Sequence, residues 1–256
     1  MRQRHNVSKY VNHFIDRTFR DVADQDYVLA RIAFRVRLDI QFIWLAHQAI
    51  EKYLKAILLY NRRSTKKLGH DLAAAYSAVC AIDDLPFNFP DTVPRFIEYL
   101  DKNSSRYFEF PYHVMGERLL ELDETVWHLR RWCENVRGEL HFGDGPEAKL
   151  VPMFPFEIKK RQNPYFFRHR QKFALFGGFL EDVLQKRRHE QLRSALLWSN
   201  AYFSHRRKPS YLVSRWASAS PPFGLHPDLI AELEPLVQFS KELQRRIGDA
   251  KRQQKA

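Results

Sequence analysis

The chain has 256 residues, of which 45% are hydrophobic, and this length can bury a core in one large domain or two small ones. It carries 42 Lys and Arg residues against 30 Asp and Glu residues, and the net charge of +12 favours a polyanionic partner such as nucleic acid. The excess is concentrated in residues 138–256, where 21 basic residues stand against 12 acidic ones, compared with 21 and 18 in residues 1–137.

Several classes of protein are disfavoured by what the chain contains. Its two cysteines, Cys80 and Cys133, lie at apolar positions of helical patterns, so neither a disulfide framework nor a thiolate metal site is expected. The N-terminus has no signal-like apolar region and no apolar run is long enough to span a membrane, which predicts a cytoplasmic protein without a membrane partner. Common nucleotide, zinc and hydrolase motifs are missing, and we expect no metal and no cofactor.

The first half of the chain has strong helical periodicity. Short helices are predicted over residues 7–20 and 23–35, followed by a helical hairpin over residues 38–72 with a basic connection. Within the hairpin, His70 or Asp71 is expected to cap the second helix, which continues to Cys80. His47, Glu51 and Lys55 form a charged i, i+4 ridge on the first helix of the hairpin, and Lys52 and Lys55 are interpreted as a solvated or dimer-facing surface.

Two further helices are predicted before residue 138. Pro94 suits the first turn of a short helix that ends near Leu100. A long helix is expected over residues 114–137, because its apolar residues follow alternating steps of four and three. This narrow seam could face another helix of the same bundle or the same helix of a second subunit.

The pattern changes after Gly138. Residues 139–164 are rich in proline and are predicted to form a linker between a helical bundle at 1–138 and a basic, mainly helical region at 165–256. In that last region we expect a helix over 190–203, a loop over 204–224 and a final helix over 227–247 that bends at Pro235. The predicted fold class is therefore all-α, an up-and-down bundle with a basic C-terminal extension.

With these helices placed, residues 20–137 resemble the HEPN domain, a family of small helical bundles common in bacterial toxin–antitoxin and nucleic-acid-processing systems. The resemblance is carried by LAHQAIEKYLKAILLYN at 45–61, by the later Gly69-His70-Asp71-Leu72, and by Arg106-Tyr107. It implies a protein that targets RNA, with a nucleotidyltransferase-like antitoxin as a partner if it belongs to a toxin pair.

Many HEPN proteins are metal-independent ribonucleases that use an arginine followed, after four to six residues, by a histidine. The resemblance gives these catalytic roles to Arg106 and His113. The spacing alone is a weak signal, because Arg63 and His70 match it as well. The position of His113 is more informative: if Pro111 lies in the first turn of the long helix, His113 is at a helix N-terminus, where a phosphate is favoured.

In this chemistry Arg106 binds the scissile phosphate, and His113 takes a proton from a ribose 2′-hydroxyl or gives one to the leaving 5′-oxygen. One histidine does not easily do both, and the resemblance implies a homodimer that brings two pairs together. Tyr107 and Pro111 depart from the pattern of the active nucleases. They favour the alternative of a noncatalytic HEPN scaffold that binds nucleic acid, nucleotide or protein, in which Arg106 forms a structural ion pair.

The C-terminal region carries basic clusters interleaved with aromatic residues, a combination that single-stranded nucleic acid requires. The same aromatic residues would also suit a hydrophobic core. The predicted nucleic-acid-binding residues are Lys159, Lys160, Arg161, Arg168, Arg170, Arg187, Arg188, Arg206 and Arg207.

Overall fold

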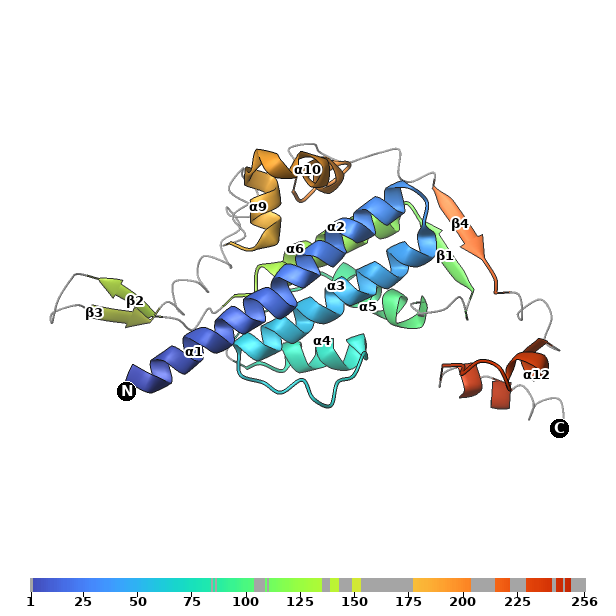
Figure 1. The fold of residues 1–256 in the computed structure, drawn as a ribbon, viewed down its shortest axis with the longest axis horizontal. Coiled ribbons are helices and arrows are strands. Elements are labelled where there is room, and N and C mark those ends of the chain that lie inside the picture. The colour runs from blue at the N-terminus through green and yellow to red at the C-terminus, as the bar shows by residue number, and fades with distance from the viewer. Residues whose placement is uncertain are drawn as a thin grey trace.

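The computed structural model describes residues 2–83, 85, 87–103, 109, 111–134, 139–142, 149–152, 177–203, 215–221, 229–240, 243–245 and 247–249 (Figure 1). Within these ranges the chain is mainly helical, with two small two-stranded sheets, which confirms the predicted helical bundle. No helix in the described ranges is long and apolar enough to cross a membrane.

The bundle begins with one continuous helical rod. The α-helix α1 (Arg2–Ile15) runs through a π-helical turn, η1 (Asp16–Arg20), into α2 (Asp21–Arg35). The two helices predicted separately are thus joined, because the backbone keeps right-handed helical angles at both ends of η1. The inward face of α2 carries fully buried Tyr27 and Phe34.

The predicted hairpin is present. Helix α3 (Asp39–Tyr60) lies along α2 in the most extensive helix pair of the bundle, and α4 (Leu72–Cys80) folds back against it (Figure 1). Of the two predicted caps, Asp71 is the one used: its carboxylate accepts a 2.7 Å hydrogen bond from the amide of Ala74. This satisfies one of the amides left open at a helix start.

The region of the predicted long helix is divided between a strand and a helix. After α5 (Thr92–Asn103), residues 112–115 form strand β1 (Tyr112–Met115), and α6 (Glu117–Arg130) starts only beyond Gly116. The predicted start at Val114 is therefore wrong. The seam residues Leu119, Leu122, Val126 and Leu129 are fully buried in the same core as α3 and α5. The seam faces its own bundle.

The C-terminal part contains short elements. Strands β2 (Glu139–Phe142) and β3 (Lys149–Pro152) pair antiparallel, inside the segment predicted as a linker. Further along lie the helices α9 (Phe179–Gln185), η3 (Arg187–His189) and α10 (Glu190–Leu197), the strand β4 (Trp216–Ala219) and the helix α12 (Leu229–Leu233).

Two sequence predictions for this part need correction. Strand β4 lies inside the segment 204–224 that was predicted as a loop. The helix predicted over 227–247 is interrupted, because α12 ends at Leu233, before Pro235. Proline lacks an amide hydrogen and its ring clashes with the preceding turn, so it favours a helix end at this point.

Helix α9 packs on the bundle through a buried ion pair between Asp24 of α2 and Arg130 of α6. The Asp24 carboxylate accepts hydrogen bonds from Tyr53 Oη at 2.7 Å, Arg130 Nε at 2.7 Å and the Leu180 amide at 3.0 Å. Arg130 also donates to the carbonyl of Gly177 at 2.7 Å. One buried carboxylate therefore joins α2, α3, α6 and the start of α9.

A second buried pair performs the same task for α10. Arg31 and Asp123 have fully buried side chains and form an ion pair. The same guanidinium donates to the carbonyls of Ala195, at 3.2 Å, and Trp198. A buried charge is tolerated only when it is paired and hydrogen-bonded, and both conditions are met here. The C-terminal helices thus supply part of the polar interior of the bundle.

Candidate functional site

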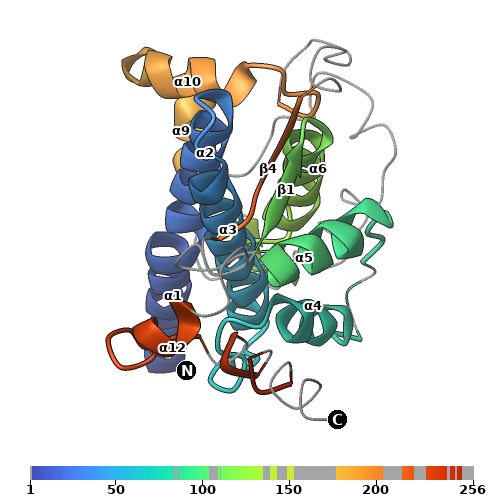
Figure 2. The same cartoon turned by 90° about the vertical axis from the view of Figure 1, so that its right-hand side faces the viewer.

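The histidine predicted to be catalytic lies on a strand. Strands β1 and β4 lie side by side (Figure 2). In this antiparallel pair His113 is opposite Ser218 and Met115 is opposite Trp216. The side chain of His113 is exposed, whereas that of Val114 is fully buried. Because helix α6 begins beyond Gly116, the predicted location of His113 at a helix N-terminus is wrong, and a helix-bound phosphate is not the basis of this site.

The strand β1 is fixed on both of its edges. On one side it pairs with β4, and the Gly116 amide donates to the carbonyl of Arg215 at 2.9 Å, which continues the pairing. On the other side, Tyr99 Oη of α5 donates a 2.7 Å hydrogen bond to the carbonyl of His113. This carbonyl therefore points away from β4, so His113 and Ser218 form a non-hydrogen-bonded pair with closely spaced side chains.

The side chain of Arg215 anchors the start of β4 to the helices. Arg215 donates to the carbonyl of Phe34 at the end of α2 and forms an ion pair with Asp39 at the start of α3. Its guanidinium carbon lies 3.8 Å from the centre of the Phe34 ring, in the geometry of a cation–π contact. Arg215 therefore links β4 to the turn between the two longest helices.

A second C-terminal contact is made by a residue that precedes His113 in the sequence. The Glu109 side chain is buried, with 5% of the residue exposed, and it accepts a 3.0 Å hydrogen bond from the amide of Ser240. Two residues from far along the chain therefore lie near His113. Ser240 binds Glu109, four positions before His113, and Ser218 lies directly opposite it. The surroundings of His113 are built by two distant parts of the sequence.

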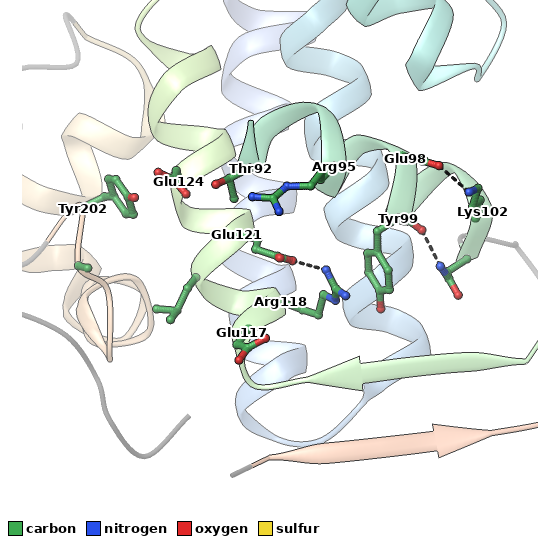
Figure 3. Close-up of a pocket in the computed structure, with 13 residues that line it drawn as sticks. Thr92, Arg95, Glu98, Tyr99, Lys102, Glu117, Arg118, Glu121, Glu124 and Tyr202 are labelled. Carbon is green, nitrogen blue, oxygen red and sulfur yellow. Dashed lines mark hydrogen bonds and ion pairs between the residues drawn. The ribbon is translucent and has the colours of Figure 1, made fainter. Parts of the chain in front are cut away.

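A groove of about 930 Å³ opens between α5 and α6, beside β1 (Figure 3). On its floor the Arg118 guanidinium carbon lies 4.2 Å from the centre of the Tyr99 ring, and Arg118 Nη1 lies 2.5 Å from Glu121 Oε2. Burial raises the pKa of Glu121, and the charge of Arg118 opposes this shift. Tyr99 thus connects the groove to the backbone of His113.

The groove has a mixed charge. Its cationic side chains are Arg95, Lys102 and Arg118. Its carboxylates are Glu98, Glu117, Glu121 and Glu124. Lys102 and Arg118 both have a carboxylate partner within the groove, namely Glu98 at 2.5 Å and Glu121 at 2.5 Å. The described part of the groove is therefore not a strong polyanion site by itself.

The charged ridge of α3 is used inside the protein. Glu51 is buried and accepts from Lys55 Nζ at 2.5 Å and from His70 Nδ1 at 3.0 Å. Burial raises the pKa of Glu51, but these hydrogen bonds outweigh it and the net shift is downward. Lys52 forms an ion pair with Asp26 at 2.7 Å. Lys52 and Lys55, which were predicted to form a solvated or dimer-facing surface, are partly exposed, and their ion pairs with Asp26 and Glu51 help to tie α3 to α2 and to the start of α4.

Most of the predicted site residues fall outside the described ranges. These are Arg106, Lys159, Lys160, Arg161, Arg168, Arg170, Arg206 and Arg207. Arg187 lies in η3, and the exposed Arg188 reaches Asp182 Oδ2 at 3.6 Å. Among the described residues, no group of three or more His, Cys, Asp and Glu side chains could hold a metal ion.

Sequence reasoning missed the residues of β4. Arg215 and Trp216 lie in a segment rich in serine that was predicted as a loop. The available signal was the alternation of Trp216, Ser218 and Ser220 with two alanines, which has the period of a strand. In so short a segment this alternation is easily overlooked.

Comparison with protein-family models matches residues 17–136 to the HEPN domain. The match begins in η1 and ends just beyond α6, so it includes His113 and excludes β4. No curated protein and no solved structure gives a significant match to the chain. The resemblance drawn from residues 20–137 is confirmed by the family match.

Proposed function

Because residues 17–136 form a HEPN domain, we propose that this protein acts on RNA as a metal-independent endoribonuclease with Arg106 and His113 as its catalytic pair. The observation that carries the proposal is the presentation of His113. Its side chain is exposed to solvent, whereas its backbone is held by Tyr99 on one side and by β4 on the other. A catalytic group needs both access to substrate and a fixed position.

The reaction would proceed by attack of a ribose 2′-oxygen on the adjacent phosphorus. The bond from phosphorus to the 2′-oxygen forms while the bond to the 5′-oxygen breaks, which leaves a 2′,3′-cyclic phosphate and a 5′-hydroxyl. His113 accepts the proton of the 2′-hydroxyl, and Arg106 neutralises charge on the phosphate oxygens. His113 of a second copy gives a proton to the 5′-oxygen, so the active form is a homodimer.

The basic C-terminal residues have a separate role in this proposal. Lys159, Lys160, Arg161, Arg168, Arg170, Arg187, Arg188, Arg206 and Arg207 bind RNA phosphates, which makes affinity fall steeply with salt. We further propose that the protein belongs to a toxin or defence system and that its partner is a nucleotidyltransferase-like antitoxin. Charge reversal of the exposed Arg188 should weaken RNA binding and reduce its salt dependence.

A noncatalytic HEPN module is the second candidate, and the groove between α5 and α6 favours it. Lys102 and Arg118 are already paired with carboxylates, so the groove suits a partner of mixed charge, such as a protein surface, better than a phosphate backbone. This candidate predicts a stable complex with a partner protein and no turnover of RNA.

Cleavage of RNA in the presence of EDTA separates the two candidates. Purified protein, freed from any antitoxin, should cleave RNA, and the variants His113→Ala and Arg106→Ala should lose at least about 100-fold in rate. His13→Ala is a matched control, because His13 is also exposed and lies on α1. Intact RNA with the unmutated protein, or equal rates for His113→Ala, would eliminate the nuclease.

A further inference from the structure

The outward face of the β1–β4 sheet carries an exposed aromatic ring beside His113. The burial pattern of both strands alternates, so that His113, Met115, Trp216 and Ser218 point outward together. Trp216 is 67% exposed, which leaves most of its ring available to solvent. Large aromatic side chains dominate recognition surfaces. Exposed Met115 lies directly opposite Trp216, so the two side chains form a contiguous apolar area instead of a single scattered residue.

The register fixes the relation between Trp216 and His113. Since Ser218 is opposite His113, Trp216 is the diagonal neighbour of His113 on the same face. Diagonal neighbours across an antiparallel pair lie about 7–8 Å apart. A nucleotide can therefore contact both residues, with its base on the indole ring and a phosphate or ribose oxygen near the imidazole.

We propose that Trp216 is a base-stacking residue that binds one unpaired nucleotide of RNA next to His113. This inference rests on the proposed function and specifies its substrate class as single-stranded RNA. A base inside a duplex is stacked on its neighbours and does not expose its flat face to a side chain, whereas an unpaired base does.

Charge favours a nucleic acid as the occupant of this face. Strand β4 belongs to the half of the chain with 21 basic and 12 acidic residues, which attracts a polyanion. The outward neighbours His113 and Ser218 are polar, so Trp216 is flanked by groups that suit a ribose and a phosphate. Exposed Val36 and Leu38, in the α2–α3 turn that Arg215 contacts, make a second copy of this chain the competing occupant.

The anchoring of β4 prepares Trp216 for binding. Arg215 precedes it directly and is fixed to Phe34 and Asp39, while Met115 lies opposite in the sheet. A residue whose backbone is already held in a strand loses less conformational entropy when a base stacks on its ring. The HEPN match ends before β4, so this contact is an addition of the C-terminal region to the domain.

Binding of an uncleavable RNA tests the inference without depending on catalysis. The probe is a fluorescein-labelled, unstructured 12-nucleotide 2′-O-methyl RNA, and its anisotropy is titrated with the full-length protein. Trp216→Ala should weaken binding by about 5- to 150-fold, because stacking of one base is worth that factor, and Trp216→Phe should retain most of the affinity. Leu236→Ala is the matched control, since Leu236 is 80% exposed in the same C-terminal region.

Three further readouts decide the matter. Tryptophan fluorescence should be quenched by the probe in the unmutated protein and much less in Trp216→Phe, and a duplex of the same sequence should bind equally to both. Equal affinity of the unmutated and Trp216→Ala proteins for the single strand, or no measurable binding, would overturn the inference. So would a change of oligomeric state in Trp216→Ala, measured by sedimentation, because it would identify the second copy as the occupant.

The nuclease proposal is judged separately, by cleavage of ordinary RNA. Binding that depends on Trp216 supports the inference even if that RNA stays intact. Cleavage that requires His113, together with binding that is indifferent to Trp216, overturns the inference and leaves the nuclease in place.

Discussion

Replacing Asp24 with asparagine should loosen the packing of α9 on the bundle. The carboxylate receives Tyr53 Oη, Arg130 Nε and the Leu180 amide, and it is fully buried. Asparagine keeps the shape but offers one acceptor oxygen and presents an NH₂ group to the same donors. At least one buried donor is therefore left without its acceptor.

The expected loss of stability follows from the charge of Arg130, which would remain buried without its partner. Arg130 is fully buried in effect, with 1% of its side chain exposed, and its pKa is raised despite the opposing effect of burial because Asp24 stabilises its charge. Removing one member of a buried ion pair leaves an uncompensated charge and costs about 3–5 kcal/mol. For a chain of this length, 1 kcal/mol corresponds to about 2–4 °C, so Tm should fall by about 6–20 °C.

Thermal and urea unfolding measure this loss, and hydrogen exchange locates it. The amides of α9 should exchange faster in Asp24→Asn, because the Leu180 amide loses its acceptor, while those of α4 should change only with global stability. The double variant Asp24→Asn with Arg130→Met removes both charges and should be less destabilised than the sum of the single variants.

Asp26→Asn is the matched control for the same substitution on the same helix. Asp26 pairs with Lys52 at 2.7 Å, but both side chains are partly exposed, at 17% and 24%, so the loss should be at most about 1 kcal/mol. If Asp24→Asn lowers Tm no more than Asp26→Asn does, the buried pair does not hold α9 on the bundle and the reasoning is refuted.

Three other predictions concern different parts of the fold. Gly178→Ala should destabilise the fold by about 2–4 kcal/mol, because the added Cβ would lie 2.6 Å from Arg130 Nη2. The control Gly177→Ala should cost only about 1 kcal/mol, because Gly177 has a similar φ of 84° but no atom within 4 Å of its added Cβ. Equal Tm values for the two variants would contradict this prediction. Burial, assisted by Arg131, lowers the pKa of His128 to about 3, so below pH 6.5 the unfolded chain binds a proton that the folded chain does not. The free energy of unfolding, measured with urea, should fall between pH 7 and pH 5, and in His128→Gln this fall should be smaller by up to about 2 kcal/mol. An unchanged pH dependence would argue against this role of His128. Arg215→Ala should accelerate hydrogen exchange at residues 112–116, which pair with β4, more than in α4. An equal acceleration in both segments would show that Arg215 does not hold β4.

The helical hairpin could be predicted from sequence because its signals are local. Apolar residues at helical spacing define α3, and the need for a side chain that can accept a hydrogen bond at the N-cap limits the start of α4 to His70 or Asp71. The family pattern depends on the same stretch and was equally accessible. These features need no information from distant parts of the chain.

The surroundings of His113 were harder to predict because β1 is only four residues long. Met115 and Leu119 have helical spacing, so the strand looked like the first turn of α6. Its partner, β4, lies in a segment of serine and alanine about 100 residues later, and pairing at such a distance leaves no local signal. Gly116, where the strand ends, was the one residue that contradicted a continuous helix.

The buried ion pairs show a different limit of sequence reasoning. Asp24, Tyr27 and Arg31 lie on one stripe of α2, together with the core residue Phe34. A charged residue on an apolar stripe usually lies at its edge, and only the partner helices reveal that Asp24 and Arg31 are inside. Asp123 and Arg130 on α6 supply those partners.

The pairing of β1 with β4 also has a consequence for the time at which the protein becomes complete. Met115 and Trp216 are neighbours in the sheet but about 100 positions apart in the chain. At about 5–20 residues per second, the ribosome adds Trp216 roughly 5–20 s after Met115, when the helices of the bundle have had ample time to form. During this interval β1 has no partner strand. The order of synthesis therefore delays assembly of the His113 surface until most of the polypeptide has been made.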